Sequence, residues 1–190
     1  MASSFEIKST RPSVGETIVT IVRDHIDYRK QIFKLAGSDL RRTYRASALG
    51  WSWAIIKPLV TIFVYWFAFA IGLRRGGDIE GYPFVLWLIS GIVPWFYMSE
   101  MLTLGTECIL RNRYLVTKMK YPVSTIPTFT SISKFSVHLI LMMITILIFV
   151  ITGNELTIYL VQLPFYMLCN FLFFTGWAMF AAPIAAISTD

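Results

Sequence analysis

Long apolar stretches alternate along this chain with short segments that are polar, basic or rich in turn-forming residues. Residues 54–73, 84–105, 123–152 and 156–189 hold three charged residues between them. A helix needs about 20 residues to cross about 30 Å of hydrocarbon. The pattern therefore predicts an all-α polytopic membrane protein. Its predicted spans lie at about 54–73, 84–105, 128–152 and 156–183, the last one bent near Pro164 and ending near Pro183.

An amphipathic helix is predicted ahead of the first span, over residues 14–36. Its apolar positions recur at helical spacing at Ile18, Val22, Ile26, Phe33 and Ala36. The opposite face is charged, with Arg23, Asp24, Asp27, Lys30 and Lys34. Two interpretations stay open, a helix lying on the membrane surface and a helix packed on its own protein. They are compatible if the helix packs on the ends of the spans.

The basic residues predict how the chain is oriented and divided. Of the 17 Lys and Arg residues, residues 1–57 hold 10 and residues 106–120 hold 4. Because segments beside the spans that are rich in Lys and Arg stay in the cytoplasm, residues 1–53 and the 106–122 loop are expected there. We therefore expect a cytoplasmic N-terminal segment at 1–49 and a transmembrane domain at 50–190.

Composition agrees with a membrane protein and excludes several other classes. The chain is 56% hydrophobic and 15% charged, against about 25% charged in soluble domains, and its mean hydropathy is +0.62. The net charge of +6 is explained by basic residues beside the spans, so no nucleic-acid partner is expected. Cys108 and Cys169 lack metal-ligand spacing, and no metal or cofactor is expected. The sequence contains no GxxxxGK[ST] loop, so ATP hydrolysis is not expected on this chain.

Three segments carry a resemblance to a known family. Residues 35–59 (LAGSDLRRTYRASALGWSWAIIKPL) join a basic stretch to Leu-Gly, Trp and Pro-Leu at the first span. The second segment comprises residues 65–76 and residues 82–97, and the latter end in GIVPWFY. The third segment, residues 115–127 (LVTKMKYPVSTIP), places two prolines five residues apart. Together these segments resemble the permease subunits of ABC-2 type exporters of polysaccharides and polyol phosphates, most closely those that translocate teichoic acid.

The resemblance implies a transport permease and not an enzyme. Its partners would be two copies of a separate ABC ATPase subunit, a second permease copy in a homodimer, and a lipid-linked polysaccharide or polyol phosphate. Such permeases have six spans, so we expect this four-span sequence to be a fragment or a truncated product. Two alternatives are an ABC-2 exporter of a drug or lipid and a membrane enzyme acting on polyprenyl-linked sugars. The enzyme would need a cluster of acids or a metal site, which the sequence pattern does not suggest.

The basic loop between the second and third spans is the candidate docking site for the ATPase. Residues 106–120 fit a short helix with apolar side chains on one side and cations exposed. The candidate docking residues are Leu110, Arg111, Arg113, Tyr114 and Lys118. The alternative is a juxtamembrane basic loop that fixes topology and contacts anionic lipid.

Two further groups of residues are candidates for contact with the exported molecule. A cationic collar at the cytoplasmic mouth would attract a carrier phosphate, and comprises Arg41, Arg42, Arg45 and Lys57. Aromatic rings could hold a sliding sugar chain, and the candidates are Tyr65, Trp66, Phe69, Trp87, Trp95, Phe96 and Tyr97. The alternatives are topology signals for the cations, and interface anchors or packing for the rings.

Glu100 and His138 are two of the ionisable residues that fall inside the predicted spans. Glu100 is expected near the inner end of the second span, where an ionisable residue is functional by default. Its candidate partners are Lys57 and Lys134, and the alternative is that it reaches the cytoplasmic interface. His138 is expected to be a packed, neutral helix residue and not a proton relay.

Overall fold

The long elements of the structure are helices. The computed structural model describes residues 13–43, 45, 49–72, 76–79, 81–119, 121–154 and 157–188. Its α-helices are α1 (Val14–Asp27), α2 (Arg29–Thr43), α3 (Trp53–Trp66), α4 (Phe84–Glu100), α5 (Cys108–Arg111), α6 (Arg113–Met119), α7 (Ile126–Ile151) and α8 (Leu163–Ser188). Short 3-10 segments precede α3, α7 and α8 at Gly50–Ser52, Val123–Thr125 and Ile158–Gln162. Turns of π-helix follow α3 and α4 at Phe67–Gly72 and Met101–Gly105.

Four of these helical segments are long and apolar enough to cross a bilayer. They are Gly50–Gly72, Phe84–Gly105, Val123–Ile151 and Ile158–Ser188. Their lengths of 23, 22, 29 and 31 residues meet the requirement of about 20 for a spanning helix. The predicted all-α, four-span architecture is therefore confirmed. The first span begins at Gly50, earlier than the predicted 54, and the predicted end at Leu73 lies outside the described residues.

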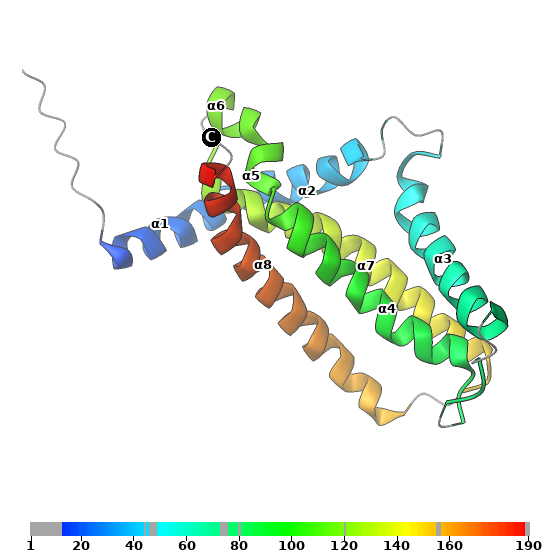
Figure 1. Cartoon of the computed structure of the whole chain (residues 1–190). Helices are drawn as coiled ribbons and strands as arrows, with labels where there is room; N and C mark the ends of the chain where they lie inside the picture. The colour runs from blue at the N-terminus through cyan, green and yellow to red at the C-terminus, as the bar shows by residue number, and fades with distance from the viewer. Residues whose placement is uncertain are drawn as a thin grey trace, which may run out of the picture.

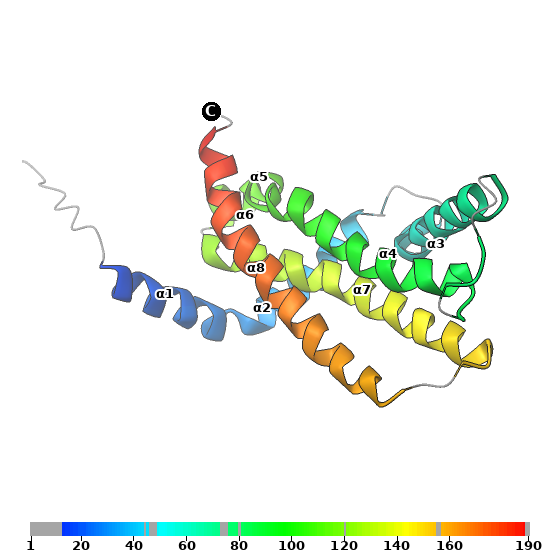
Figure 2. The same cartoon turned by 60° about the horizontal axis from the view of Figure 1, so that its bottom comes forward.

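The helix pair α4 and α7 forms the centre of the bundle (Figures 1 and 2). Helix α3 covers one side of this pair and α8 crosses its other side, while α1 extends away from the bundle. Helices α2, α5 and α6 and the end of α8 gather at one end, which we name the basic end. The opposite end, named the turn end, carries the end of the first span, the start of α4, the end of α7 and the start of the fourth span (Figure 1).

Three clusters of buried side chains hold the bundle together along its length. At the basic end, Ile32 and Ala36 of α2 pack with Leu115, Phe129 and Ala182. In the middle, a second cluster joins α4, the π-turn after it and α8 through Tyr97, Met101, Phe174 and Ala178. Towards the turn end, a third joins α3, α4 and α7 through Ile62, Leu86, Ile89, Val93, Leu141 and Met142. Tight packing of this kind drives helix association in a membrane.

The single amphipathic helix predicted over 14–36 is two helices. A capping box starts α1, because Ser13 Oγ accepts from the Glu16 N–H at 3.2 Å and the Glu16 carboxylate accepts from the Ser13 N–H at 2.8 Å. The chain breaks at Tyr28, and α2 continues to Thr43. The apolar side chains of α1 are exposed, whereas Ile32 and Ala36 of α2 are buried on the protein. The packed interpretation therefore holds for α2, and the position of α1 on a membrane surface stays a prediction.

The fourth span is bent at its start as expected but does not end at Pro183. Its 3-10 segment changes to α-helix at Leu163, next to Pro164, which sits in the first turn where a missing N–H costs nothing. The helix then continues through Pro183 to Ser188, so the predicted end was wrong. At the other predicted turn, Gly153 has a φ of +76°, a backbone conformation that favours glycine. Of the residues predicted in the outer turns, Arg74, Arg75, Glu80 and Glu155 lie outside the described ranges.

Candidate functional site

Arg42 ties α2 to the loop between the second and third spans. Its guanidinium donates to Asn112 Oδ1 at 3.0 Å and to the Tyr114 hydroxyl at 3.5 Å. The same group pairs with Asp39 at 3.6 Å and lies 5.8 Å from the centroid of the Tyr114 ring. Arg presents several donors in a rigid fork and stacks on aromatic faces, which suits this set of contacts. The amphipathic helix and the loop are thus joined by one side chain.

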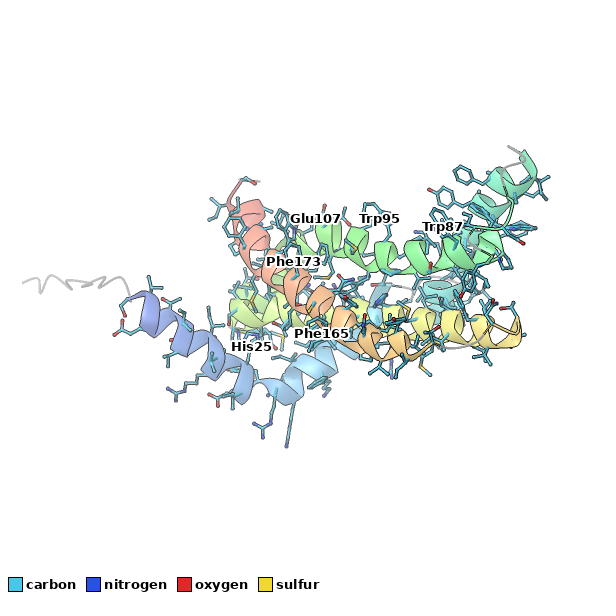
Figure 3. All side chains as sticks on the ribbon, turned by 90° about the horizontal axis from the view of Figure 1, so that it is seen from below. His25, Trp87, Trp95, Glu107, Phe165 and Phe173 are labelled. Atoms are coloured by element: carbon cyan, nitrogen blue, oxygen red, sulfur yellow. The ribbon has the colours of Figure 1, made fainter. Side chains whose placement is uncertain are left out.

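Helix α1 is joined to the start of α7 by two further hydrogen bonds. The Ser124 hydroxyl donates to the Asp24 carboxylate at 2.8 Å. The His25 imidazole nitrogen Nε2 lies 2.8 Å from the Thr128 hydroxyl (Figure 3). The polar side of α1 contacts the protein, and Ile18, Val22 and Ile26 are left exposed.

The predicted docking helix over 106–120 is two short helices, α5 and α6, that meet at Asn112. The buried Asn112 side chain donates to the Cys108 carbonyl at 2.8 Å and accepts from Arg42, so it holds the junction. Among the candidate docking residues, Arg111, Arg113 and Lys118 are exposed and Leu110 is half-buried. Tyr114 is 44% exposed, even though it contacts Arg42. Lys120, at the end of the predicted helix, lies outside the described residues.

The buried cysteine beside this junction is chemically inert. Cys108 is fully buried, and burial raises the pKa of its thiol to about 12 from its ordinary 9.0. Tyr121, at the end of the same loop, has its hydroxyl pKa raised by burial as well. No group of three or more His, Cys, Asp or Glu side chains placed to hold a metal ion occurs in the described part of the chain.

The four cations of the predicted collar do not meet at one point. Arg42 is engaged by Asp39, Asn112 and Tyr114. Arg41 and Arg45 are exposed beside it, at the end of α2 and in the turn that follows. Lys57 lies on another helix, α3. The collar as a whole stays a prediction.

Three of the predicted channel aromatics fall on one ladder of rings. It runs from Tyr65 of α3 and Phe69 of the π-helical segment after it to Phe84 and Trp87 of α4, with successive centroids 6.5, 6.2 and 6.0 Å apart. Trp66 lies beside the ladder and packs on Phe63 at 5.9 Å. Phe84 was not among the candidates, although its position at the helix start, next to the interface, is the signal that could have found it.

The remaining three candidates are consecutive residues of α4 that lie apart from this ladder and differ in exposure. Trp95 is exposed and points away from α7 (Figure 3). Phe96 is half-buried, and Tyr97 is 2% exposed. The seven candidate rings therefore do not form one continuous path within a single chain. Their shared role as a channel lining is still a prediction.

A chain of buried hydroxyls links the three central helices. The Thr175 hydroxyl donates to the Phe171 carbonyl at 2.7 Å, so it accepts from Ser131 at 2.6 Å. Ser131 in turn accepts from the Tyr97 hydroxyl at 2.8 Å. The bonds join α4 to α7 and α7 to α8. The sequence analysis missed Ser131 and Thr175, because a serine or threonine in an apolar helix gives no sign of its partner.

Glu100 is paired with Lys134 inside the bundle. The distance from Nζ to Oε2 is 3.6 Å, and the lysine side chain is 5% exposed while the carboxylate is 41% exposed. Of the two partners left open by the sequence, the structure selects Lys134. His138 is buried and stacks on Tyr97 with centroids 5.5 Å apart, so the prediction that it is packed is confirmed.

At the turn end, an apolar cavity of about 380 Å³ lies between α4, α7 and the start of the fourth span. It is lined by Tyr82, Trp87, Met142, Phe149 and Leu163 among others. Its volume falls within the range of about 300–1,000 Å³ that is usual for small-molecule sites.

Comparison with known proteins gives three relatives with one description. Over 130 residues, 67% of this chain, it is 29% identical to the O-antigen export system permease protein RfbA of Myxococcus xanthus. Two proteins of the same name from Klebsiella pneumoniae are 28% and 27% identical over 93 residues, 49% of this chain. The chain spans about half the length of the first relative, 48%, and 34% of the other two. No protein-family model matches the chain.

Proposed function

We propose that this chain is membrane-spanning permease machinery of an ABC-type exporter that moves a lipid-linked polysaccharide across a bacterial plasma membrane. The observation that carries the proposal is the similarity to three permeases named for O-antigen export, in a chain with four apolar helices of spanning length. The resemblance of three segments of the sequence to ABC-2 permeases agrees with this similarity.

The basic end is the proposed cytoplasmic side. Exposed cations of α2 and of the α5–α6 loop gather there, and Lys and Arg beside spans favour the cytoplasm. Four crossings then place both ends of the described chain on that side. The exposed apolar face of α1, formed by Ile18, Val22 and Ile26, would lie at the inner membrane surface.

The α5–α6 loop is the proposed contact for a separate ATPase subunit. Arg113 and Lys118 project from it without an ion pair in the described residues, and Tyr114 presents a half-exposed ring. Because Arg42 fastens this loop to α2, and α2 packs on α7, a push on the loop would reach a spanning helix through direct contacts. Two permease and two ATPase copies, implied by the family resemblance, belong to this proposal.

Co-purification with a co-expressed partner ABC ATPase tests the docking. The double variant Arg113→Glu/Lys118→Glu reverses two exposed charges and should reduce the retained ATPase at least about tenfold. A matched control, Gln162→Glu, changes charge at an exposed position at the turn end and should retain the ATPase fully. Equal retention by both variants would remove the docking assignment.

The particular polymer is a narrower proposal. The three sequence segments resemble most closely the teichoic-acid permease TarG, whereas the relatives are named for O-antigen export. A hydroxyl-rich chain that slides would suit ring faces such as Tyr65, Phe69 and Trp87, which hold sugars without a fixed set of hydrogen bonds. ATPase activity of the reconstituted complex should rise with the lipid-linked polymer that is exported, and not with the other.

One observation favours a second candidate, an exporter of a drug or lipid. The cavity of about 380 Å³ at the turn end has the volume of a small-molecule site and is lined mainly by apolar side chains. Stimulation of ATPase activity by apolar drugs, abolished by Met142→Trp, would support that candidate over the polymer exporter.

A further inference from the structure

A second cavity, with ionisable side chains in a largely apolar lining, lies between α3, α4 and α7. Its volume is about 150 Å³, and its lining includes Lys57, Thr61, Ser99, Glu100, Lys134 and His138. These residues come from three different helices and are brought together by the fold. The cavity is separate from the aromatic ladder and from the α5–α6 loop.

The charges around this cavity do not balance. Its lining contains two lysines and one acid, so the Glu100–Lys134 pair leaves Lys57 without an opposite charge. The pair itself is long, at 3.6 Å, and Lys134 makes no other ion pair in the described part of the chain. An almost fully buried ammonium is costly unless opposite charge and hydrogen-bond acceptors surround it. The volume of the cavity and the excess positive charge of its lining therefore favour binding of an anion.

A buried imidazole nitrogen without a hydrogen-bond partner also belongs to the lining of the cavity. His138 is 3% exposed and lines the cavity, and its Nδ1 has no hydrogen-bond partner. Buried polar atoms are almost always hydrogen-bonded in folded proteins, so an unpaired one marks a place where a further group binds. His138 adds a potential hydrogen bond to the charge of the two lysines.

Size and depth restrict what the anion can be. The cavity is smaller than the range of about 300–1,000 Å³ of drug-sized sites, but it exceeds the space of about 10–15 Å³ that one water needs. Glu100 lies five residues before the end of its span, and Lys57 lies seven residues after the start of its own. At about 1.5 Å per residue, Glu100 and Lys57 lie about 8 and about 11 Å from those span ends, and Lys134 lies about 17 Å from the start of its own span, in the half of the bundle at the basic end.

We propose that this cavity binds the phosphate group of a lipid in the leaflet at the basic end. Lys57 and Lys134 hold the phosphate. Glu100 is the counter-ion of Lys134 in the empty cavity, and the phosphate takes its place when the lipid binds. Lys is a common point-charge ligand of phosphate, and the lipid headgroups of the leaflet at the basic end are the nearest source of that group. The site is independent of polymer export, because any lipid with an accessible phosphate carries the same chemistry.

Binding of defined lipids to the purified full chain tests the proposal. A fluorescently labelled polyprenyl monophosphate, the matching polyprenol and phosphatidylglycerol are titrated in detergent micelles, each with and without inorganic phosphate. The monophosphate should bind at least about tenfold tighter than the polyprenol, since charged hydrogen bonds are made only by the phosphate. Phosphatidylglycerol tighter than polyprenol also supports a lipid phosphate.

The variant Lys134→Met keeps the apolar stem and removes the charge, and it should lose at least about tenfold in affinity for the monophosphate. Glu100→Gln should bind as tightly as the parent or tighter. Lys118→Met is the matched control, because it removes the same charge from an exposed position on α6. Should Lys134→Met not fold, the exposed Lys57→Met carries the test with the same expected direction.

Three results would overturn the proposal. One is equal binding of the polyprenol and its monophosphate. Another is unchanged affinity in the folded lysine variant. The third is displacement of the lipid by inorganic phosphate at equal concentration, which would assign the cavity to the free ion.

Discussion

The hydroxyl chain from Tyr97 through Ser131 to Thr175 supports a graded prediction about stability. Because Thr175 donates to a carbonyl, the order of donors is fixed and Tyr97 is the terminal donor. Tyr97→Phe removes that donor and leaves the Ser131 oxygen with one acceptor position unused, which costs little free energy of unfolding. Ser131→Ala leaves the Tyr97 O–H unpaired in a buried site, which is more costly.

The magnitudes follow from what each substitution removes. One interhelical hydrogen bond in a membrane protein contributes about 0.6 kcal/mol on average and about 1.7 at most, so Tyr97→Phe should fall in that range. Ser131→Ala should exceed it, since two bonds are lost and a donor is stranded. Tyr97→Ala also removes a fully buried ring that packs on Phe135, Phe174 and His138, and should cost about 3–5 kcal/mol.

Reversible unfolding by SDS in mixed micelles, followed by tryptophan fluorescence, measures these differences. Thr103→Val is the control, because its exposed hydroxyl bonds to its own helix at Ser99 and the change should stay within about 0.5 kcal/mol. The donor order is refuted if Ser131→Ala proves milder than Tyr97→Phe. Burial of the ring is refuted if Tyr97→Ala costs no more than Tyr97→Phe.

Three further predictions concern the basic end and the α4–α8 contact. A Cβ at Gly105 would lie 3.3 Å from the Ala178 side chain of α8, so Gly105→Val should destabilise the chain by about 1–3 kcal/mol in the same assay. The control is Gly91→Val, which has open space around it and should not disturb the contact with α8. Arg42→Ala should raise amide exchange in α6 at least about tenfold, whereas the exposed Arg41→Ala should leave it unchanged; equal protection in both would mean that Arg42 does not hold the loop. Burial raises the thiol pKa of Cys108 from 9.0 to about 12, so Cys108 should resist iodoacetamide at pH 8 until SDS unfolds the chain. For the same reason, the contribution of the buried thiol to stability should be lost as the pH rises from about 9 towards 12. Rapid labelling of the folded chain, read by mass spectrometry, would contradict the burial.

The architecture was predictable because the signals for spanning helices are long and uninterrupted. Residues 84–105 and 123–152 could be assigned from apolar length alone, and the structure agrees with both. The break at Tyr28 and the junction at Asn112 were not predictable. Each depends on a tertiary contact, α2 packing on α7 in one case and Arg42 reaching Asn112 in the other.

The candidate site was predictable by residue type and less so by arrangement. Sequence reasoning picked out Glu100 and offered Lys134 as one of two partners, since an intramembrane acid needs a cation nearby. It grouped Arg42 with the other basic residues because neighbours in sequence were taken as neighbours in space. The fold instead turns Arg42 to the loop and brings Lys57 to Lys134, which is 77 residues away.

The central claim is that the chain threads a bilayer with its basic end in the cytoplasm. Single cysteines at Gly77, exposed in the turn after the first span, and at Lys118, exposed on α6, test it in a background with Cys108 and Cys169 replaced by alanine. In intact cells, a membrane-impermeant maleimide should label position 77 and should reach position 118 only after the membrane is opened. Labelling of both positions from outside, or of position 118 alone, would contradict the account.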